Sequence, residues 1–189
     1  MLDRHQALLL LHEYTASDAL RKHMYAVELA MRAMAGRYGA DPEMWGVVGL
    51  LHDFDYERFP NPERMPEREH PSEGVRILAG QGLPEDAQQA ILGHASYTGV
   101  PRTTPLAKAL FAVDELCGFL VACALITPHR SLDEVEVAGV RKKMKRADFA
   151  RNVSREDIVN GAAELGVELD PHIAVTLEAL RGIRDELGL

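Results

Sequence analysis

The sequence has few cysteines and no long hydrophobic run, and both absences exclude classes of protein. Its two cysteines, Cys117 and Cys123, lie six residues apart on a predicted helix and would face different directions, so we expect no disulfide. No stretch approaches the ~18 apolar residues that a membrane-spanning helix needs. The leucines of residues 1–14 are flanked by acidic and histidine residues with no cleavage site of small residues behind them, which indicates a helix and not a signal peptide. We therefore expect no membrane association and a location in the reducing cytoplasm.

The sequence also lacks an excess of basic residues. It has 21 Lys and Arg against 29 Asp and Glu, which gives a net charge of −8. This charge argues against a general binder of nucleic acids or of anionic membranes, although it leaves room for a local basic patch. The 47% of hydrophobic and 26% of charged residues are ordinary for a globular protein. A chain of 189 residues is long enough for one domain with a sizeable core.

Apolar residues recur at helical spacing almost throughout the chain. They fall at every third or fourth position in 17–39, and the segment 103–126 is long, apolar and predicted to be central. Other segments with helical spacing, several of them behind a Ser, Asp or Pro suited to a helix start, are 41–54, 70–82, 83–97, 131–150, 154–166 and 170–188. The prolines and charges of 55–70 predict a surface loop. Because no strand or repeat is evident, the sequence predicts an all-α protein with a single domain over 1–189.

Six histidine and aspartate residues fall at defined places among these predicted helices. They are His23, His52, Asp53, His70, His94 and Asp114. Asp114 is the least expected, because a carboxylate inside an apolar helix is costly unless it is paired or binds a metal. No two of the six have the local spacing of a zinc finger or of a zinc protease helix. Any site made from them must therefore be assembled from separate helices.

The order of these six residues resembles the HD-domain superfamily of metal-dependent phosphohydrolases, in its longer version with two metal ions. The resemblance implies an HD-domain helix bundle with a metal-site core at about 17–126 and further helices at 127–189. It implies that one metal is held by His23, His52, Asp53 and Asp114, and that Asp53 bridges to a second metal held by His70 and His94.

The chemistry of these side chains agrees with that implication. Mixed imidazole and carboxylate ligands suit Mn, Fe, Ni or Zn better than Ca or Mg. Two such ions can share a hydroxide and hold a phosphate for in-line attack. We therefore expect a phosphohydrolase that cleaves a phosphomonoester or phosphodiester bond of a nucleotide or another small metabolite, with Asp53 keeping the two ions at working distance.

The sequence departs from many members of that superfamily directly after the His-Asp pair. They continue with Ile-Gly-Lys, whereas "HDFDYE" has Asp55 in place of the glycine and Tyr56 in place of the lysine. One substrate-binding cation is thus missing, and Asp55 becomes a candidate functional acid. Replacement cations for a phosphorylated substrate are expected among Arg102 and the basic segment 141–151, with the candidates Lys142, Lys143, Lys145 and Arg146.

Two alternative functions belong to different classes. The same ligand set is similar to that of myo-inositol oxygenase and related di-iron oxygenases, so an oxygenase acting on a small organic substrate is the second reading. Metal identity would separate the two enzymes, because their ligands are shared. A metal-stabilised module that binds a partner without catalysis is the third reading. The sequence makes no prediction of the oligomeric state.

Overall fold

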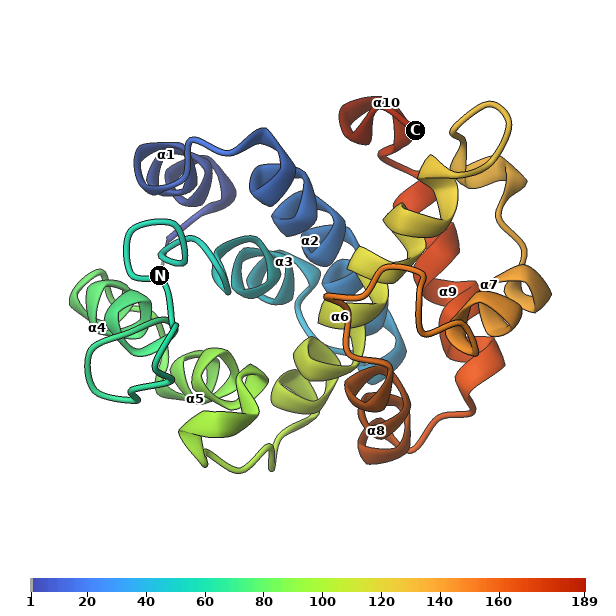
Figure 1. Cartoon of the computed structure of the whole chain (residues 1–189). Helices are drawn as coiled ribbons and strands as arrows, with labels where there is room; N and C mark the ends of the chain where they lie inside the picture. Colours follow the sequence, from blue (N-terminus) through green and yellow to red (C-terminus); the bar gives the residue numbers. More distant parts are fainter. Residues whose placement is uncertain (1) are drawn as a thin grey trace.

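The computed structural model describes residues 2–189 and consists of α-helices joined by turns and loops (Figure 1). Within these residues there is no β-strand, which confirms the predicted all-α fold. Ten α-helices follow one another in the described part of the chain: α1 (Arg4–Tyr14), α2 (Asp18–Tyr38), α3 (Pro42–Leu51), α4 (Ser72–Gly80), α5 (Glu85–His94), α6 (Pro105–Leu125), α7 (Val137–Met144), α8 (Arg155–Leu165), α9 (Leu169–Arg181) and α10 (Arg184–Leu187). Two short 3₁₀ helices are η1 (Ser96–Thr98) and η2 (Leu132–Glu134).

Side-chain caps set the starts of the helices that matter for the site. Ser17 accepts the backbone N–H of Leu20 at the start of α2, and Asp41 caps α3 directly before Pro42. Thr104 caps α6 in the same way. At the other end of α2, Gly39 adopts a left-handed conformation with φ of 62°, which suits glycine and ends the helix.

Helix α6 lies in the middle of the molecule, between the group α1–α5 and the group α7–α10 (Figure 1). It packs against α2, α5, α8 and α9, and α2 packs in turn against α3. Most residues of α6 are buried, including Leu116, Phe119 and Leu120, because its apolar side chains extend around nearly the whole helix. The long apolar segment predicted to be central therefore forms the core. None of the helices in residues 2–189 has the length and hydrophobicity needed to cross a bilayer.

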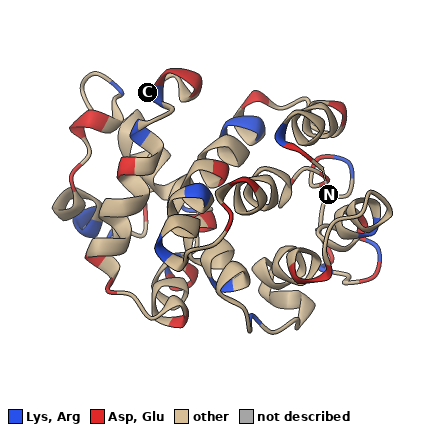
Figure 2. Ribbon diagram, turned by 180° about the vertical axis from the view of Figure 1, so that it is seen from behind, with Lys and Arg blue, Asp and Glu red and all other residues tan. Residues whose placement is uncertain are grey.

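A cluster of ion pairs around one buried carboxylate joins α1, α2 and α3. The carboxylate of Glu28, which is fully buried, lies 2.6 Å from Nε of Arg4 and 3.0 Å from Nε of Arg32. Arg32 also pairs with Glu43 at the start of α3. Because a buried carboxylate needs such partners, the cluster fixes the position of α1 and α3 on α2. Elsewhere, acidic and basic residues are interspersed along the described helices (Figure 2).

Two predicted helices are wrong in extent: the segment 170–188 is divided into α9 and α10, and the segment 131–150 is broken up further. Residues 131–150 were expected to form a single helix, but they form η2, the short helix α7 and then turns. Ser131 caps η2, Val135 is extended, and Glu136 is the N-cap of α7, so the chain changes direction between the two elements. The periodic apolar residues of this segment contact the core from different elements.

The close contact between α6 and α8 makes a testable prediction about packing. A Cβ atom added at Gly161 of α8 would lie 2.6 Å from Cα of Ala112 in α6. Gly161→Ala should therefore lower the free energy of unfolding by about 1–3 kcal/mol through overpacking. Gly36→Ala in α2 is the matched control, because a Cβ there meets nothing within 4 Å. It should raise the free energy of unfolding by up to about 1 kcal/mol. Urea denaturation measures both changes, and a change of the same sign in the two variants would contradict this packing.

Candidate metal centre

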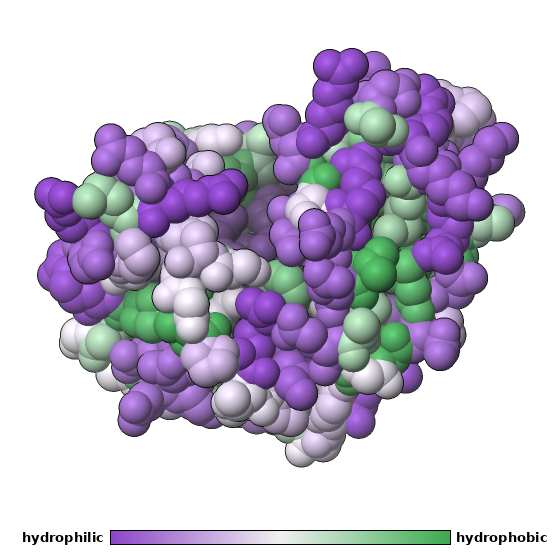
Figure 3. All heavy atoms as spheres, turned by 60° about the horizontal axis from the view of Figure 1, so that its bottom comes forward, coloured by the Kyte–Doolittle hydropathy of each residue, from purple (hydrophilic) through white to green (hydrophobic). Residues whose placement is uncertain are grey.

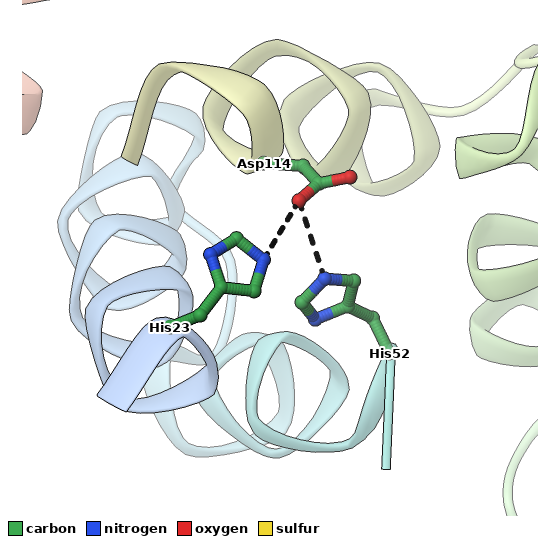
Figure 4. A group of neighbouring side chains, drawn as sticks. All are labelled: His23, His52 and Asp114. Carbon is green, nitrogen blue, oxygen red and sulfur yellow. Dashed lines mark hydrogen bonds and ion pairs between the residues drawn. The ribbon is translucent and has the colours of Figure 1, made fainter. Parts of the chain in front are cut away.

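The six predicted ligand residues converge from separate elements onto one centre. His23 lies in α2 and Asp114 in α6, and both point toward His52, which caps the end of α3 (Figure 4). Asp53 follows His52 directly, and His94 is the last residue of α5. His70 lies at the end of the loop that precedes α4. The fold thus brings together residues separated by up to 91 positions in the sequence.

Asp114 forms the first part of the centre with two histidines. Its Oδ1 lies 3.0 Å from Nε2 of His23 and 3.3 Å from Nε2 of His52. Figure 4 shows both interactions, with the two imidazoles on the same side of the carboxylate. The three ligand atoms are close enough together to share one metal ion.

Asp53 forms the second part of the centre, and its carboxylate lies close to all four histidines. Its Oδ1 is 3.2 Å from Nε2 of His70, 3.3 Å from Nε2 of His94 and 3.5 Å from Nε2 of His52. Its Oδ2 lies 3.9 Å from Nε2 of His23. His52, Asp53 and His94 form a second group that could hold a metal ion, so His52 belongs to both groups.

Hydrogen bonds fix which nitrogen each buried imidazole presents to the centre. Nδ1 of His52 donates to the carbonyl of Gly49 at 2.8 Å, and Nδ1 of His94 donates to the carbonyl of Ile91 at 2.5 Å. A carbonyl can only accept, so the proton is on Nδ1 and the lone pair of a neutral ring is on Nε2. Such anchoring of the remote ring nitrogen is typical of histidines that bind metals.

The Nε2 atoms that face the centre fit a cation better than they fit one another. Nε2 of His52 is fully buried and makes no well-formed hydrogen bond, although Oδ1 of Asp114 lies 3.3 Å from it. Nε2 of His70 and Nε2 of His94 lie only 3.3 Å apart, and in neutral rings both would present lone pairs. Nitrogen atoms about 2.1 Å from one tetrahedral ion would be spaced by roughly that distance. The donor set, its spacing and the unpartnered nitrogen therefore fit a divalent transition metal.

The imidazoles and carboxylates of the centre shift one another's pKa values. Burial lowers the pKa of His52, but Asp53 and Asp114 outweigh it and raise this pKa to about 9. The pKa of His70 is likewise lowered by burial but raised to about 10 by Asp53 and Asp55. Burial raises the pKa of Asp53 and of Asp114, but the neighbouring histidines reverse this and hold both pKa values below the usual range. The two aspartates are thus charged at neutral pH and need positive partners.

A cavity of about 630 Å³ opens beside the metal centre. The loop before α4 contributes Asn61 and Arg64 to its lining, and the segment before α8 contributes Asn152 and Val153. All the predicted ligand residues except the buried His52 also line it. Glu115 joins α6 to the segment before α8, because its Oε2 accepts the backbone N–H of Ser154 at 3.0 Å. The face drawn in Figure 3 is hollowed near its centre, with hydrophilic residues around the hollow.

The sequence model of the HD domain family matches residues 20–118, just over half of the chain. The chain belongs to the HD domain family. Membership of this superfamily of metal-dependent phosphohydrolases confirms the resemblance, and the matched segment contains all six predicted ligands. HD domains bind divalent metals, and most members of the family are metal-dependent hydrolases. No curated protein and no solved structure matches the chain.

The structure corrects the expected role of Asp55 in this HD domain. Its Oδ1 accepts Nδ1–H of His70 at 2.7 Å, and its Oδ2 accepts the backbone N–H of Gly74 at 2.7 Å. The side chain is only 1% exposed and does not line the cavity. Asp55 therefore cannot meet a substrate as a functional acid. It is a positioning residue that orients the imidazole of His70.

The cations expected to bind substrate do not line the cavity either. The guanidinium of Arg102 pairs with Glu164 at 2.7 Å and donates to the carbonyl of Gly93 at 2.7 Å, so its donors are occupied by the fold. Arg146 pairs with Asp148 on the surface. Lys142, Lys143 and Lys145 lie at the end of α7 and just beyond it, away from the cavity lining. Only the turn that directly follows the basic segment 141–151 reaches the cavity, where it places Asn152 in the wall.

Sequence reasoning missed the residues that support His70 and the cavity wall. The hydroxyl of Tyr97 donates to the carbonyl of His70 and accepts Nδ2 of Asn61 at 3.1 Å. Neither residue belongs to a recognisable motif, and they are 36 positions apart in the sequence. The only available signal was their position in or near loops that flank a predicted ligand.

Metal affinity should depend on pH in a direction set by the histidines. His52 and His70 carry protons at neutral pH in the metal-free protein, whereas an imidazole that binds metal must be deprotonated. Raising the pH toward 9 should therefore strengthen binding, by up to about tenfold per pH unit for each proton displaced. Competition with a chelator at several pH values measures this, and calorimetry in two buffers counts the protons. Affinity that is constant between about pH 6 and 8 would contradict these pKa shifts.

Asp55→Asn should weaken metal binding without unfolding the protein. The amide would present a donor either to Nδ1–H of His70 or to the N–H of Gly74, so one hydrogen bond must be lost. Loss of such a supporting partner costs about 10–100-fold in metal affinity. The matched control is Asp133→Asn, at a carboxylate that is 56% exposed and outside the centre. Equal metal affinity of the two variants would show that Asp55 does not position His70.

Proposed function

We propose that the protein is a metal-dependent phosphohydrolase that cleaves a phosphomonoester or phosphodiester bond in a nucleotide or another small phosphorylated metabolite. The observation that carries this proposal is the convergence of three imidazoles and two carboxylates at the base of one cavity, with the buried imidazole of His52 close to both carboxylates. Membership of the HD domain family supports hydrolase chemistry at such a centre.

Two ions, rather than one, are proposed from the position of Asp53. Its Oδ1 lies 3.2 Å from Nε2 of His70, 3.3 Å from Nε2 of His94 and 3.5 Å from Nε2 of His52, while its Oδ2 lies 3.9 Å from Nε2 of His23. A carboxylate that lies beside two ligand sets can bridge two cations. His70 and His94 would hold one ion, and His23, His52 and Asp114 the other, with Asp53 shared between them. Manganese, iron, nickel and zinc are the candidates, because they accept imidazole and carboxylate together.

Two such ions, when bound, neutralise phosphate charge and lower the pKa of a shared water. The protein's own residues provide the geometry for this chemistry. Backbone carbonyls hold His52 and His94 in one orientation, and Asp55 does the same for His70. Because these acceptors are buried, the ligands are already arranged before a substrate arrives.

The size of the cavity supports a small substrate. Its volume of about 630 Å³ is in the range of pockets that bind cofactors and drug-sized molecules. A net charge of −8 makes a long nucleic acid an unfavourable partner. The proposed substrate is therefore a phosphorylated small molecule that reaches the centre through this cavity.

The test is turnover of phosphate esters by the protein reconstituted in turn with each candidate metal. Wild type should release phosphate from a panel of nucleotides and small phosphomonoesters and phosphodiesters. Asp53→Ala should lose on the order of 10³-fold or more in kcat/KM, because several kcal/mol of charge stabilisation would disappear. Asp133→Ala, which changes an exposed carboxylate, should behave as wild type.

Two other results would contradict the proposal in different ways. Dioxygen consumption by the iron-loaded protein with an organic substrate, without phosphate release, would indicate the oxygenase alternative. Full metal occupancy without turnover of any substrate would favour the non-catalytic binding module.

A further inference from the structure

The cavity beside the metal centre has a marked imbalance of charge. Its lining contains the carboxylates of Asp53, Asp114, Glu115 and Asp157. Within residues 2–189, Arg64 is the only lysine or arginine in that lining. Beyond the metal ligands, an anionic substrate would therefore meet one protein cation, Arg64, and the two carboxylates of Glu115 and Asp157.

Within residues 2–189, the exposed side chain of Arg64 has no partner of its own. Arg32, Arg102 and Arg146 are all paired with carboxylates. The guanidinium of Arg64, by contrast, makes no hydrogen bond or ion pair with any other residue of the described range 2–189. Its five donors are free to meet a group that enters the cavity.

The backbone at Arg64 is held in a conformation that ordinary residues rarely adopt. Its φ is 54°, in the left-handed region that favours glycine. The backbone N–H of Arg64 donates to the carbonyl of Asn61 at 3.2 Å, which closes a tight turn with Pro62 inside it. Non-glycine residues in this region cost free energy and are often found at ligand-binding sites.

Hydrogen bonds tie this turn to the metal centre. At its start, Nδ2 of Asn61 donates to the hydroxyl of Tyr97, which donates in turn to the carbonyl of the ligand residue His70. Directly after the turn, the backbone N–H of Met65 donates to Glu69 at 2.7 Å. Arg64 thus extends from a segment whose position relative to His70 is fixed at both ends.

We propose that Arg64 binds the anionic phosphate group of the substrate and so determines which compounds the enzyme accepts. This inference rests on the proposed function, since it assigns the substrate's phosphate to a specific side chain. The planar guanidinium can donate two parallel hydrogen bonds to a phosphate, which lysine cannot do. Because the other charged groups of the lining are carboxylates, the phosphate is oriented toward the loop before α4. The wall formed by Asn152 and Asp157 then faces the neutral or donor-bearing part of the substrate.

The test is the affinity of the manganese-loaded protein for inorganic phosphate, measured by titration calorimetry. Arg64→Ala should bind phosphate about 10–100-fold more weakly than wild type, because charge-assisted hydrogen bonds are lost. The phosphate affinity of Arg64→Lys should lie between those of wild type and Arg64→Ala, since lysine keeps the charge but lacks the paired donors. The matched control is Arg68→Ala, in the same loop but outside the lining, where the guanidinium contacts only Sδ of Met65. Manganese content and thermal unfolding, measured for every variant, show that the centre and the fold are intact.

The possible results separate this inference from the proposed function. Equal phosphate affinity of Arg64→Ala and Arg68→Ala would overturn the role of Arg64, as would a manganese-loaded wild type that binds no phosphate. Selective loss of phosphate binding in Arg64→Ala, together with no hydrolysis of any phosphate ester by wild type, would support the anion site. The same result would contradict the phosphohydrolase.

Discussion

Mutual repulsion among buried ligand atoms is the constraint on which the site depends. Asp53 and Asp114 bring two negative charges into the interior, and three imidazoles anchored through Nδ1 direct Nε2 at them. Without cations, these groups are compatible only if the histidines take up protons, as the raised pKa values of His52 and His70 show. The remaining structure can be understood as the framework that holds this arrangement in place.

Two close approaches let the framework bring the ligands together. A Cβ atom at Gly49 would lie 2.9 Å from the carbonyl oxygen of Val27, so only glycine lets α3 approach α2 this closely and place His52 near His23. A Cβ atom at Gly74 would lie 2.6 Å from Cγ of Asp55, where the backbone N–H holds the carboxylate that orients His70. The loop before α4 is therefore positioned by the same contacts that position a ligand. The cavity wall and the metal centre are parts of one structure.

The fold and the ligand set could be predicted from the sequence, but the surroundings of the ligands could not. Helical periodicity and caps located α2, α5 and α6 to within a few residues. The family resemblance selected the six candidate ligand residues. The role of Asp55 depends on the direction of its carboxylate, which accepts a hydrogen bond from His70. Arg102 forms an ion pair with Glu164, which is 62 positions away in the sequence. No local pattern encodes such contacts. The division into a core at 17–126 and C-terminal helices stays a prediction, although α8 and α9 pack directly on α6.

Metal content is the measurement that tests the central claim most directly. Plasma mass spectrometry of the purified protein, beside Asp53→Ala prepared identically, counts the ions that this centre holds. The account predicts close to two transition-metal ions per chain in wild type and loss of both in the variant, because Asp53 contacts both ligand sets. A single ion would contradict the bridging role of Asp53 and leave His70 and His94 as structural residues. A wild type that takes up no transition metal even when it is offered in excess would contradict the metal centre itself.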